Sequence, residues 1–146
     1  MSVLRRLSLV VALVLLASSA RAQFPPGAPM RIVIVVDSSA AVGPMLTQFR
    51  AGLNELLDDL DGTPEITLVS TGGQLRIRVP ITTDRDKIRD GVGHFTADGG
   101  ANELIDGLVE ADRRFLQTAP DRRPVFVVIT TDAGETVGEQ RIDAYN

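Results

Sequence analysis

The stretch that most constrains the fold is Ile32–Val36, five consecutive β-branched residues that lead directly into Asp37, Ser38 and Ser39. An unbroken apolar run rich in Val and Ile is typical of a strand buried on both faces, as at the centre of a parallel sheet. In open α/β sheets, ligands bind in the crevice outside the carboxyl ends of the strands. We therefore expect any functional site of this chain to begin at Asp37–Ser39.

A second strand of the same design is predicted near the end of the chain. The apolar run from Val125 to Thr130 leads through Thr131 into Asp132. If the two strands are parallel neighbours, their carboxyl ends meet at one edge of the sheet, and Asp37 and Asp132 project from that edge together.

The residues between these two strands predict helices and a hairpin. Apolar residues recur at spacings of three and four from Leu46 to Leu60, and Pro44 suits the first turn of that helix. Glu65–Ser70 and the alternating stretch Leu75–Ile81 are expected to form an antiparallel hairpin, with Pro80 assigning the second strand to a sheet edge. Thr83 or Asp84 can cap a short helix with the apolar face Ile88, Val92 and Phe95, and a longer helix follows with Leu104, Ile105, Leu108, Val109, Phe115 and Leu116.

The N-terminus reads as a targeting segment. Arg5 and Arg6 precede an apolar stretch, Leu7–Leu16, and small residues follow up to Ala22. The apolar stretch is shorter than the roughly 20 residues of a membrane-spanning helix. We predict a cleaved signal peptide at residues 1–22, a linker at residues 23–30 and a domain at residues 31–146, exported to the periplasm, the cell surface or the medium. An uncleaved signal anchor is the alternative.

Composition argues against several classes of function. After loss of the signal peptide, twelve basic residues face nineteen acidic ones, a net charge of −7, and this balance disfavours nucleic-acid binding. The chain has no cysteine and a single histidine, His94, which excludes thiol chemistry and disfavours His-based catalysis or zinc sites. No G-x-S-x-G nucleophile motif occurs. We expect a protein that is not an enzyme.

Three separated motifs together resemble the von Willebrand factor type A domain over Arg31–Glu135. The D-x-S-x-S motif of the family aligns with Asp37–Ala41, its Gly-Gly-Thr-Asn loop with Gly99–Asn102, and its last aspartate loop with Ile129–Gly134. The resemblance implies a Rossmann-like α/β fold: an open, mostly parallel sheet with one antiparallel edge strand and helices on both faces. Because such domains usually continue with further strands and helices, we expect a type A domain that is incomplete at its C-terminus.

The resemblance also implies a metal-ion-dependent adhesion site, in a degenerate form. Asp37, Ser39 and Asp132 match ligands of the family, whereas Ala41 and Ala101 replace its second serine and its threonine. Mg²⁺ prefers oxygen ligands and tolerates several waters, so it is expected to bind weakly or not at all. Asp98 is a candidate for a substitute oxygen. In the alternative interpretation, the strand-end acids only cap the helices that follow.

Two functions follow from this reading. The first is an exported, non-catalytic protein-binding or adhesion-type module that holds a protein or surface ligand at the loops beyond its strands, with weak or lost dependence on a divalent cation. The second is a structural or assembly domain without such a ligand, or a fragment of a larger type A protein. The strand Val125–Thr130 favours the second, because it is too apolar for a comfortable exposed edge.

Overall fold

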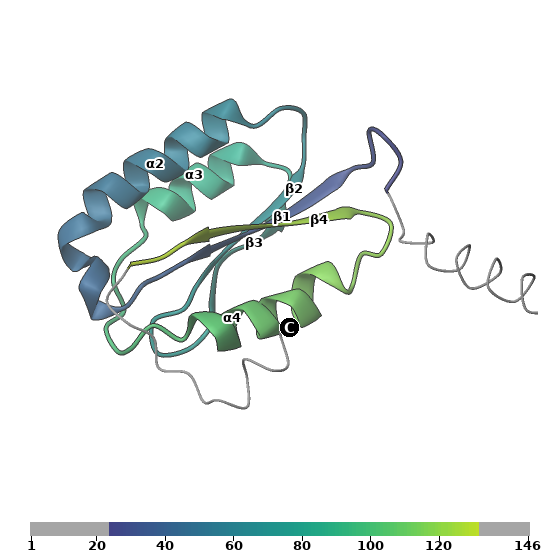
Figure 1. Ribbon diagram of the computed structural model, residues 1–146. Helices are drawn as coiled ribbons and strands as arrows, with labels where there is room; N and C mark the ends of the chain where they lie inside the picture. The colour runs from purple at the N-terminus through teal and green to yellow at the C-terminus, as the bar shows by residue number, and fades with distance from the viewer. Residues whose placement is uncertain (1–23, 132–146) are drawn as a thin grey trace, which may run out of the picture.

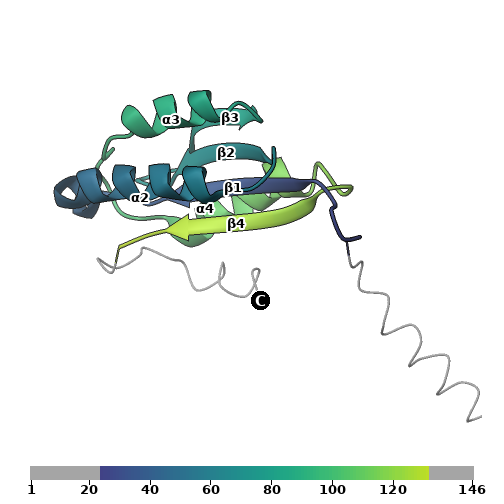
Figure 2. The same cartoon turned by 90° about the horizontal axis from the view of Figure 1, so that it is seen from above.

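The central strand β1 (Met30–Val36) lies between two parallel neighbours in the computed structural model, which describes residues 24–131 (Figure 1). The described sheet has four strands in the order β3-β2-β1-β4, which Figure 2 shows side by side. β1 pairs in parallel with β2 and β4, and β2 pairs antiparallel with β3. The other strands are β2 (Glu65–Ser70), β3 (Arg76–Thr82) and β4 (Arg123–Ile129).

Helices cover both faces of the sheet, as the sequence predicts (Figure 1). A short 3-10 helix, η1, joins β1 to α2, and a π-helical segment, η2, continues α4. One face carries α2 (Leu46–Asp59) and α3 (Arg85–Gly93), and the other carries α4 (Leu104–Ala111) and η2 (Asp112–Leu116). η1 spans Ala40–Met45.

The apolar run of β1 supplies the core of both layers. Ile32, Ile34 and Val36 pack in the cluster beneath α2 and α3, whereas Val33 and Val35 pack in the cluster beneath α4. Each of the five side chains is at most 2% exposed. A strand buried on both faces therefore explains why this stretch has no polar break.

β3 is an edge strand, as Pro80 predicts, but it does not keep the alternation of its sequence. The pairing of β2 with β3 shifts register between Ile66 and Val69. As a result, Val79 is buried beneath α2 and α3, whereas Ile77 is 45% exposed. Arg78 turns toward the interior, where its guanidinium lies 5.5 Å from the centre of the Phe95 ring.

The helix ends differ from expectation in two places. Pro44 lies inside η1 rather than in the first turn of an α-helix. The single long helix expected from Leu104 to Leu116 is α-helical only to Ala111 and then π-helical. Asp84 does cap α3, since its carboxylate accepts hydrogen bonds from the backbone N–H groups of Asp86 and Lys87.

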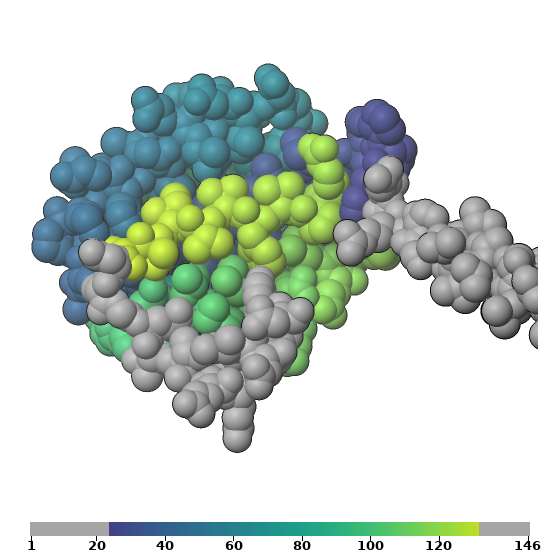
Figure 3. Space-filling view, viewed as in Figure 1, coloured from purple at the N-terminus to yellow at the C-terminus, as the bar shows by residue number. Residues whose placement is uncertain are grey.

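β4 forms the second edge of the described sheet. Within residues 24–131 it pairs only with β1. Figure 3 shows its side chains as a band across the surface between the two helical layers. Val128 on this strand is 41% exposed. In the part of the chain that the structure describes, no helix is long and apolar enough to cross a membrane.

Candidate functional site

Four loops meet beyond the carboxyl ends of the parallel strands. The backbone N–H of Asp37 donates to the carbonyl of Ile129 at 2.8 Å, which joins the loop after β1 to the end of β4. The loop after β2 joins the same region, because the N–H of Thr71 donates to the carbonyl of Val36 at 3.1 Å. The fourth loop, residues 94–103, connects α3 to α4 and crosses this edge.

Asp37 is fully buried and holds two of these loops in place. Its Oδ1 accepts a hydrogen bond from the backbone N–H of Ser39 at 2.7 Å. Its Oδ2 accepts a hydrogen bond from the hydroxyl of Thr131 at 2.7 Å. The carboxylate thus shapes the turn after β1 and ties it to the segment that follows β4.

Ser39 carries a buried hydroxyl that has no hydrogen-bond partner among residues 24–131. The residue is 4% exposed, and its Oγ meets no donor or acceptor in that part of the chain. It precedes η1 but makes no capping bond to that helix. A buried hydroxyl left unpaired costs about 1–3 kcal/mol, so this oxygen is suited to a ligand that supplies the missing interaction.

Within the described residues, the other positions that correspond to the family's metal site add no side-chain oxygen to those of Asp37 and Ser39. Ala41 is half-buried and Ala101 is exposed, and both side chains are methyl groups. Asp132 lies outside the described residues, so its predicted role stays a prediction. Among residues 24–131, no three His, Cys, Asp or Glu side chains are grouped to hold a metal ion.

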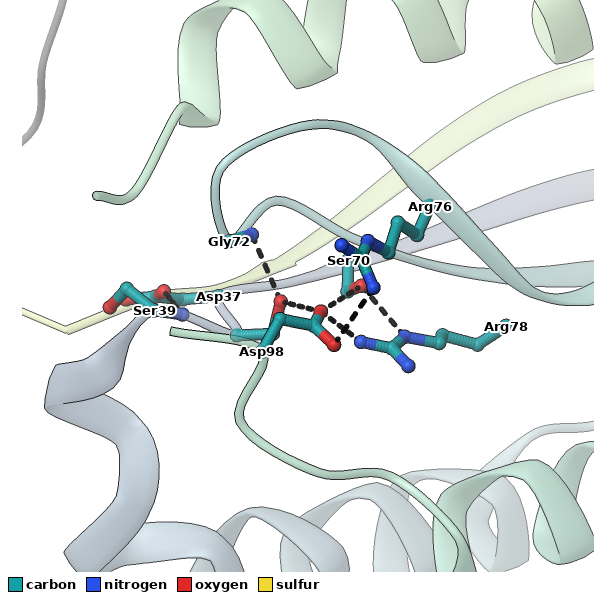
Figure 4. Close-up of polar contacts among 8 residues, drawn as sticks. Asp37, Ser39, Ser70, Gly72, Arg76, Arg78 and Asp98 are labelled. Carbon is teal, nitrogen blue, oxygen red and sulfur yellow. Dashed lines mark hydrogen bonds and ion pairs between the residues drawn. The ribbon is translucent and has the colours of Figure 1, made fainter. Parts of the chain in front are cut away.

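Asp98, the candidate for a substitute oxygen, points toward the arginines of β3 (Figure 4). Its Oδ2 accepts a hydrogen bond from the Ser38 hydroxyl at 2.7 Å and forms an ion pair with Arg78. Arg76 Nη1 lies 3.5 Å from its Oδ1. Burial raises the pKa of Asp98, but the hydrogen bonds from Arg78 and Ser38 and the charges of Arg78 and Arg76 outweigh it and lower the pKa overall.

Ser38 looks like a plain loop residue in the sequence, but it is fully buried and joins three segments. Its hydroxyl donates to Asp98 and accepts from the backbone N–H of Gly72 at 2.9 Å. Its carbonyl accepts from the N–H of Asp98 at 2.7 Å. The sequence motif marks Ser39 and leaves Ser38 at a variable position, so nothing in the sequence indicates this role of Ser38.

Glycines allow the loops to approach each other closely. A Cβ added to Gly72 would lie 2.5 Å from the carbonyl oxygen of Ser38. Gly73 donates its N–H to the carbonyl of Ala101 at 2.8 Å, and both Gly73 and Gly100 have positive φ angles. The Gly72-Gly73 pair lies in the connection between β2 and β3, and this connection packs against the Gly99-Gly100 loop.

Asn102 bridges the strands on either side of β1. It is 4% exposed. Its Oδ1 accepts from the Thr71 hydroxyl at 2.7 Å, and its Nδ2 donates to the Thr130 hydroxyl at 2.9 Å. In the sequence, Asn102 is notable only as the last residue of the Gly-Gly-Thr-Asn motif. Its bridging role becomes visible only once the order of the strands in the sheet is known.

The other polar residues considered from the sequence have partners elsewhere. His94 is at the end of α3 with its side chain 81% exposed. Arg122 lies 3.0 Å from Glu65, and Arg114 lies 2.5 Å from Glu110.

Comparison with known proteins identifies the family. The sequence profile described as von Willebrand factor type A domain matches residues 32–135. The match covers most of the chain, and the chain therefore belongs to the von Willebrand factor type A domain family. No curated protein matches the sequence significantly.

Solved structures share the fold at low sequence identity. A von Willebrand factor type A protein from Catenulispora acidiphila is 20% identical, with a TM-score of 0.67 over 80% of this chain and 30% of that one. Proximal thread matrix protein 1 from the mussel byssus is 16% identical, with a TM-score of 0.66 over 80% and 35%. The pili tip protein Mfa5 from Porphyromonas gingivalis is 19% identical, with a TM-score of 0.60 over 69% and 19%.

These neighbours confirm the predicted Rossmann-like α/β fold. The chain spans about a third or less of each of these three proteins. A further structure of the mussel protein, 15% identical with a TM-score of 0.64, has zinc in its metal-ion-dependent adhesion site.

Proposed function

We propose that this chain is an exported, non-catalytic module that binds a protein or surface ligand through the loops beyond β1, β2 and β4. The convergence of these loops around the buried, unpartnered hydroxyl of Ser39 carries the proposal. Further support comes from the neighbours, which include a thread matrix protein and a pilus tip protein.

A divalent cation is the ligand that best fits the unpartnered hydroxyl. Ser39 and Asp37 would hold it, with Asp132 as the third protein ligand, and waters would stand where Ala41 and Ala101 lack oxygens. A bound cation would offer an acidic partner group a point of attachment. Because Mg²⁺ requires near-ideal octahedral geometry, the two missing side-chain oxygens make weak or lost binding the expectation for this chain.

The test is calorimetric titration of the purified protein with Mg²⁺. We expect weak binding that Ser39→Ala removes, whereas Thr83→Ala, at an exposed hydroxyl, leaves it unchanged. Restoring the two oxygens with Ala41→Ser and Ala101→Thr is expected to strengthen binding. Mg²⁺ binding by the restored variant alone would show that the site has lost its affinity through these two substitutions. No heat of binding in either protein would contradict a cation site here.

Export is part of the proposal and has its own test. Expression in a host with a general secretion pathway should yield a processed protein outside the cytoplasm, with Gln23 as its first residue. N-terminal sequencing measures this directly. A protein that keeps residues 1–22 in the membrane fraction would instead support an uncleaved anchor.

A second candidate function is assembly through the β4 edge. The 41% exposure of Val128 favours it, because an apolar edge strand is a template for pairing with another strand. For assembly between copies, sedimentation equilibrium should show association that Val128→Lys abolishes. Ile77→Lys, at a similarly exposed apolar residue on the β3 edge, should leave association intact. A protein that stays monomeric at all concentrations would contradict self-assembly.

A further inference from the structure

Two arginines share one carboxylate at the side of the candidate site. Arg76 and Arg78 both come from β3, and both reach Asp98 in the loop between α3 and α4 (Figure 4). Ser38 connects this cluster to the site, since its hydroxyl donates to Asp98 and its chain neighbours are Asp37 and Ser39. The cluster of Arg76, Arg78 and Asp98 therefore carries one positive charge in excess, and Ser38 joins it to the loop that holds Ser39.

Arg78 is committed to the fold. Its side chain is 20% exposed, its guanidinium pairs with Oδ2 of Asp98, and its Nε donates to the Ser70 hydroxyl at 2.8 Å. It also lies over the ring of Phe95. With a carboxylate, a hydroxyl and an aromatic ring around it, Arg78 neutralises Asp98 and has little left to offer a partner.

Arg76 is in the opposite situation. Its side chain is 49% exposed, and its closest approach to Asp98 is 3.5 Å, longer than a normal N–H···O hydrogen bond. Asp98 already accepts hydrogen bonds from Arg78 and Ser38. Most of the five N–H donors of the Arg76 guanidinium thus face solvent.

We propose that Arg76 is a recognition residue for a carboxylate on an acidic segment of a protein partner. A guanidinium presents its donors in a planar fork that matches a carboxylate in two parallel hydrogen bonds. The inference rests on the proposed function for the location of the partner, but it needs no bound cation.

The charge of the whole chain makes this position selective. The protein is acidic, with a net charge of −4, so its overall field repels an acidic segment. The arginine pair reverses that sign locally, at the edge where the loops meet. Complementary charge at one place on an otherwise repelling surface fixes where and how such a segment docks.

The test uses acetyl-pentaglutamate amide as the probe, in low salt with EDTA present. We expect saturable shifts of the Arg76 Nε–Hε signal in ¹⁵N NMR spectra, and we expect Arg76→Gln to weaken binding about tenfold. Arg89→Gln is the matched control, because Arg89 is a partly exposed arginine on α3 that pairs with Asp58. An unchanged amide spectrum of each variant will show that the fold is intact.

The outcomes separate this inference from the proposed cation site. Binding that requires Arg76 but not Ser39 supports the inference, even if Mg²⁺ does not bind. Equal losses in Arg76→Gln and Arg89→Gln would overturn it in favour of general electrostatic attraction. Binding that requires Mg²⁺ and Ser39 would also overturn it while supporting the cation site. Inorganic phosphate that binds more tightly than the peptide would overturn the assignment to a carboxylate.

Discussion

The guanidinium of Arg78 and the carboxylate of Asp98 form an ion pair between residues 20 positions apart, with side chains only 20% and 8% exposed. The same carboxylate accepts a hydrogen bond from the hydroxyl of Ser38. One acid therefore joins the edge strand β3 to the loop after the central strand β1. A pair so far removed from water depends on both of its partners, because a charge left alone in such a place is costly.

Replacement of Asp98 by Asn should destabilise the protein by about 2 kcal/mol, because the variant leaves Arg78 without its counter-charge. Urea denaturation followed by circular dichroism measures the free energy of unfolding. Asp58→Asn is the control, since Asp58 is 66% exposed in its pair with Arg89, and it should change stability by less than about 0.5 kcal/mol. Equal effects of the two variants would contradict a special role for Asp98.

The lowered pKa of Asp98 predicts a dependence of stability on pH. The folded pKa lies below the ordinary value of 3.8, so the unfolded chain binds this proton more tightly. The stabilisation from Asp98 should be complete well above pH 3.8 and should be lost as the pH falls through the lowered pKa. Urea titrations from pH 6 to about pH 2.5 should show this loss in the wild type. In Asp98→Asn the pH-dependent stabilisation from this carboxylate should be missing. Identical pH profiles of stability in the two proteins would contradict its assignment to Asp98.

Most of the fold follows from local pattern in the sequence. The apolar runs ending at Val36 and Ile129 correctly predict two strands, although only β1 is buried and β4 is partly exposed within the described residues. Pro80 correctly predicts an edge. The ion pair of Asp98 with Arg78 was not predictable, because the alternation of Leu75–Ile81 assigns its arginines to solvent. The register shifts against β2 change that assignment, and nothing in the strand's own residues signals them.

Substitution of Gly72 by Ala should destabilise the protein by about 2 kcal/mol, because the new methyl group would lie 2.5 Å from the Ser38 carbonyl oxygen. Gly52→Ala should change the stability in the opposite direction. Gly52 lies within α2 with nothing within 4 Å of an added Cβ, and the change should stabilise the helix by about 1 kcal/mol. Thermal denaturation of both variants measures the contrast. A tolerated alanine at position 72 would show that the loops can separate.

The site was predicted in part. The motif that contains Asp37 and Ser39 indicates the correct loop, and both side chains are buried there. The roles of Ser38 and Asn102 depend on partners at least 34 and 28 residues away along the chain, respectively, so they require the three-dimensional arrangement of the strands. Local pattern can indicate a loop at a strand end, but it does not identify the segment that will pack against it.

The variant Asn102→Ala should have a free energy of unfolding about 2 kcal/mol lower than the wild type, because the buried Thr71 hydroxyl then loses its acceptor. Gln48→Ala is the control at an exposed position of α2 and should change stability by less than about 0.5 kcal/mol. Guanidinium denaturation measures both. A neutral Asn102→Ala would mean that water replaces the amide between Thr71 and Thr130.

The bond between Asp37 and Thr131 joins residues 94 positions apart, and the one between Ser38 and Asp98 joins residues 60 apart. Contacts of such long sequence separation form slowly, because loop-closure entropy opposes them until most of the chain has been ordered. The loops beyond the strands therefore come together as a late product of folding. While residues up to Thr131 are still being synthesised or remain unfolded, the proposed binding surface is not assembled. The appearance of binding during refolding would therefore report that these loops have come together.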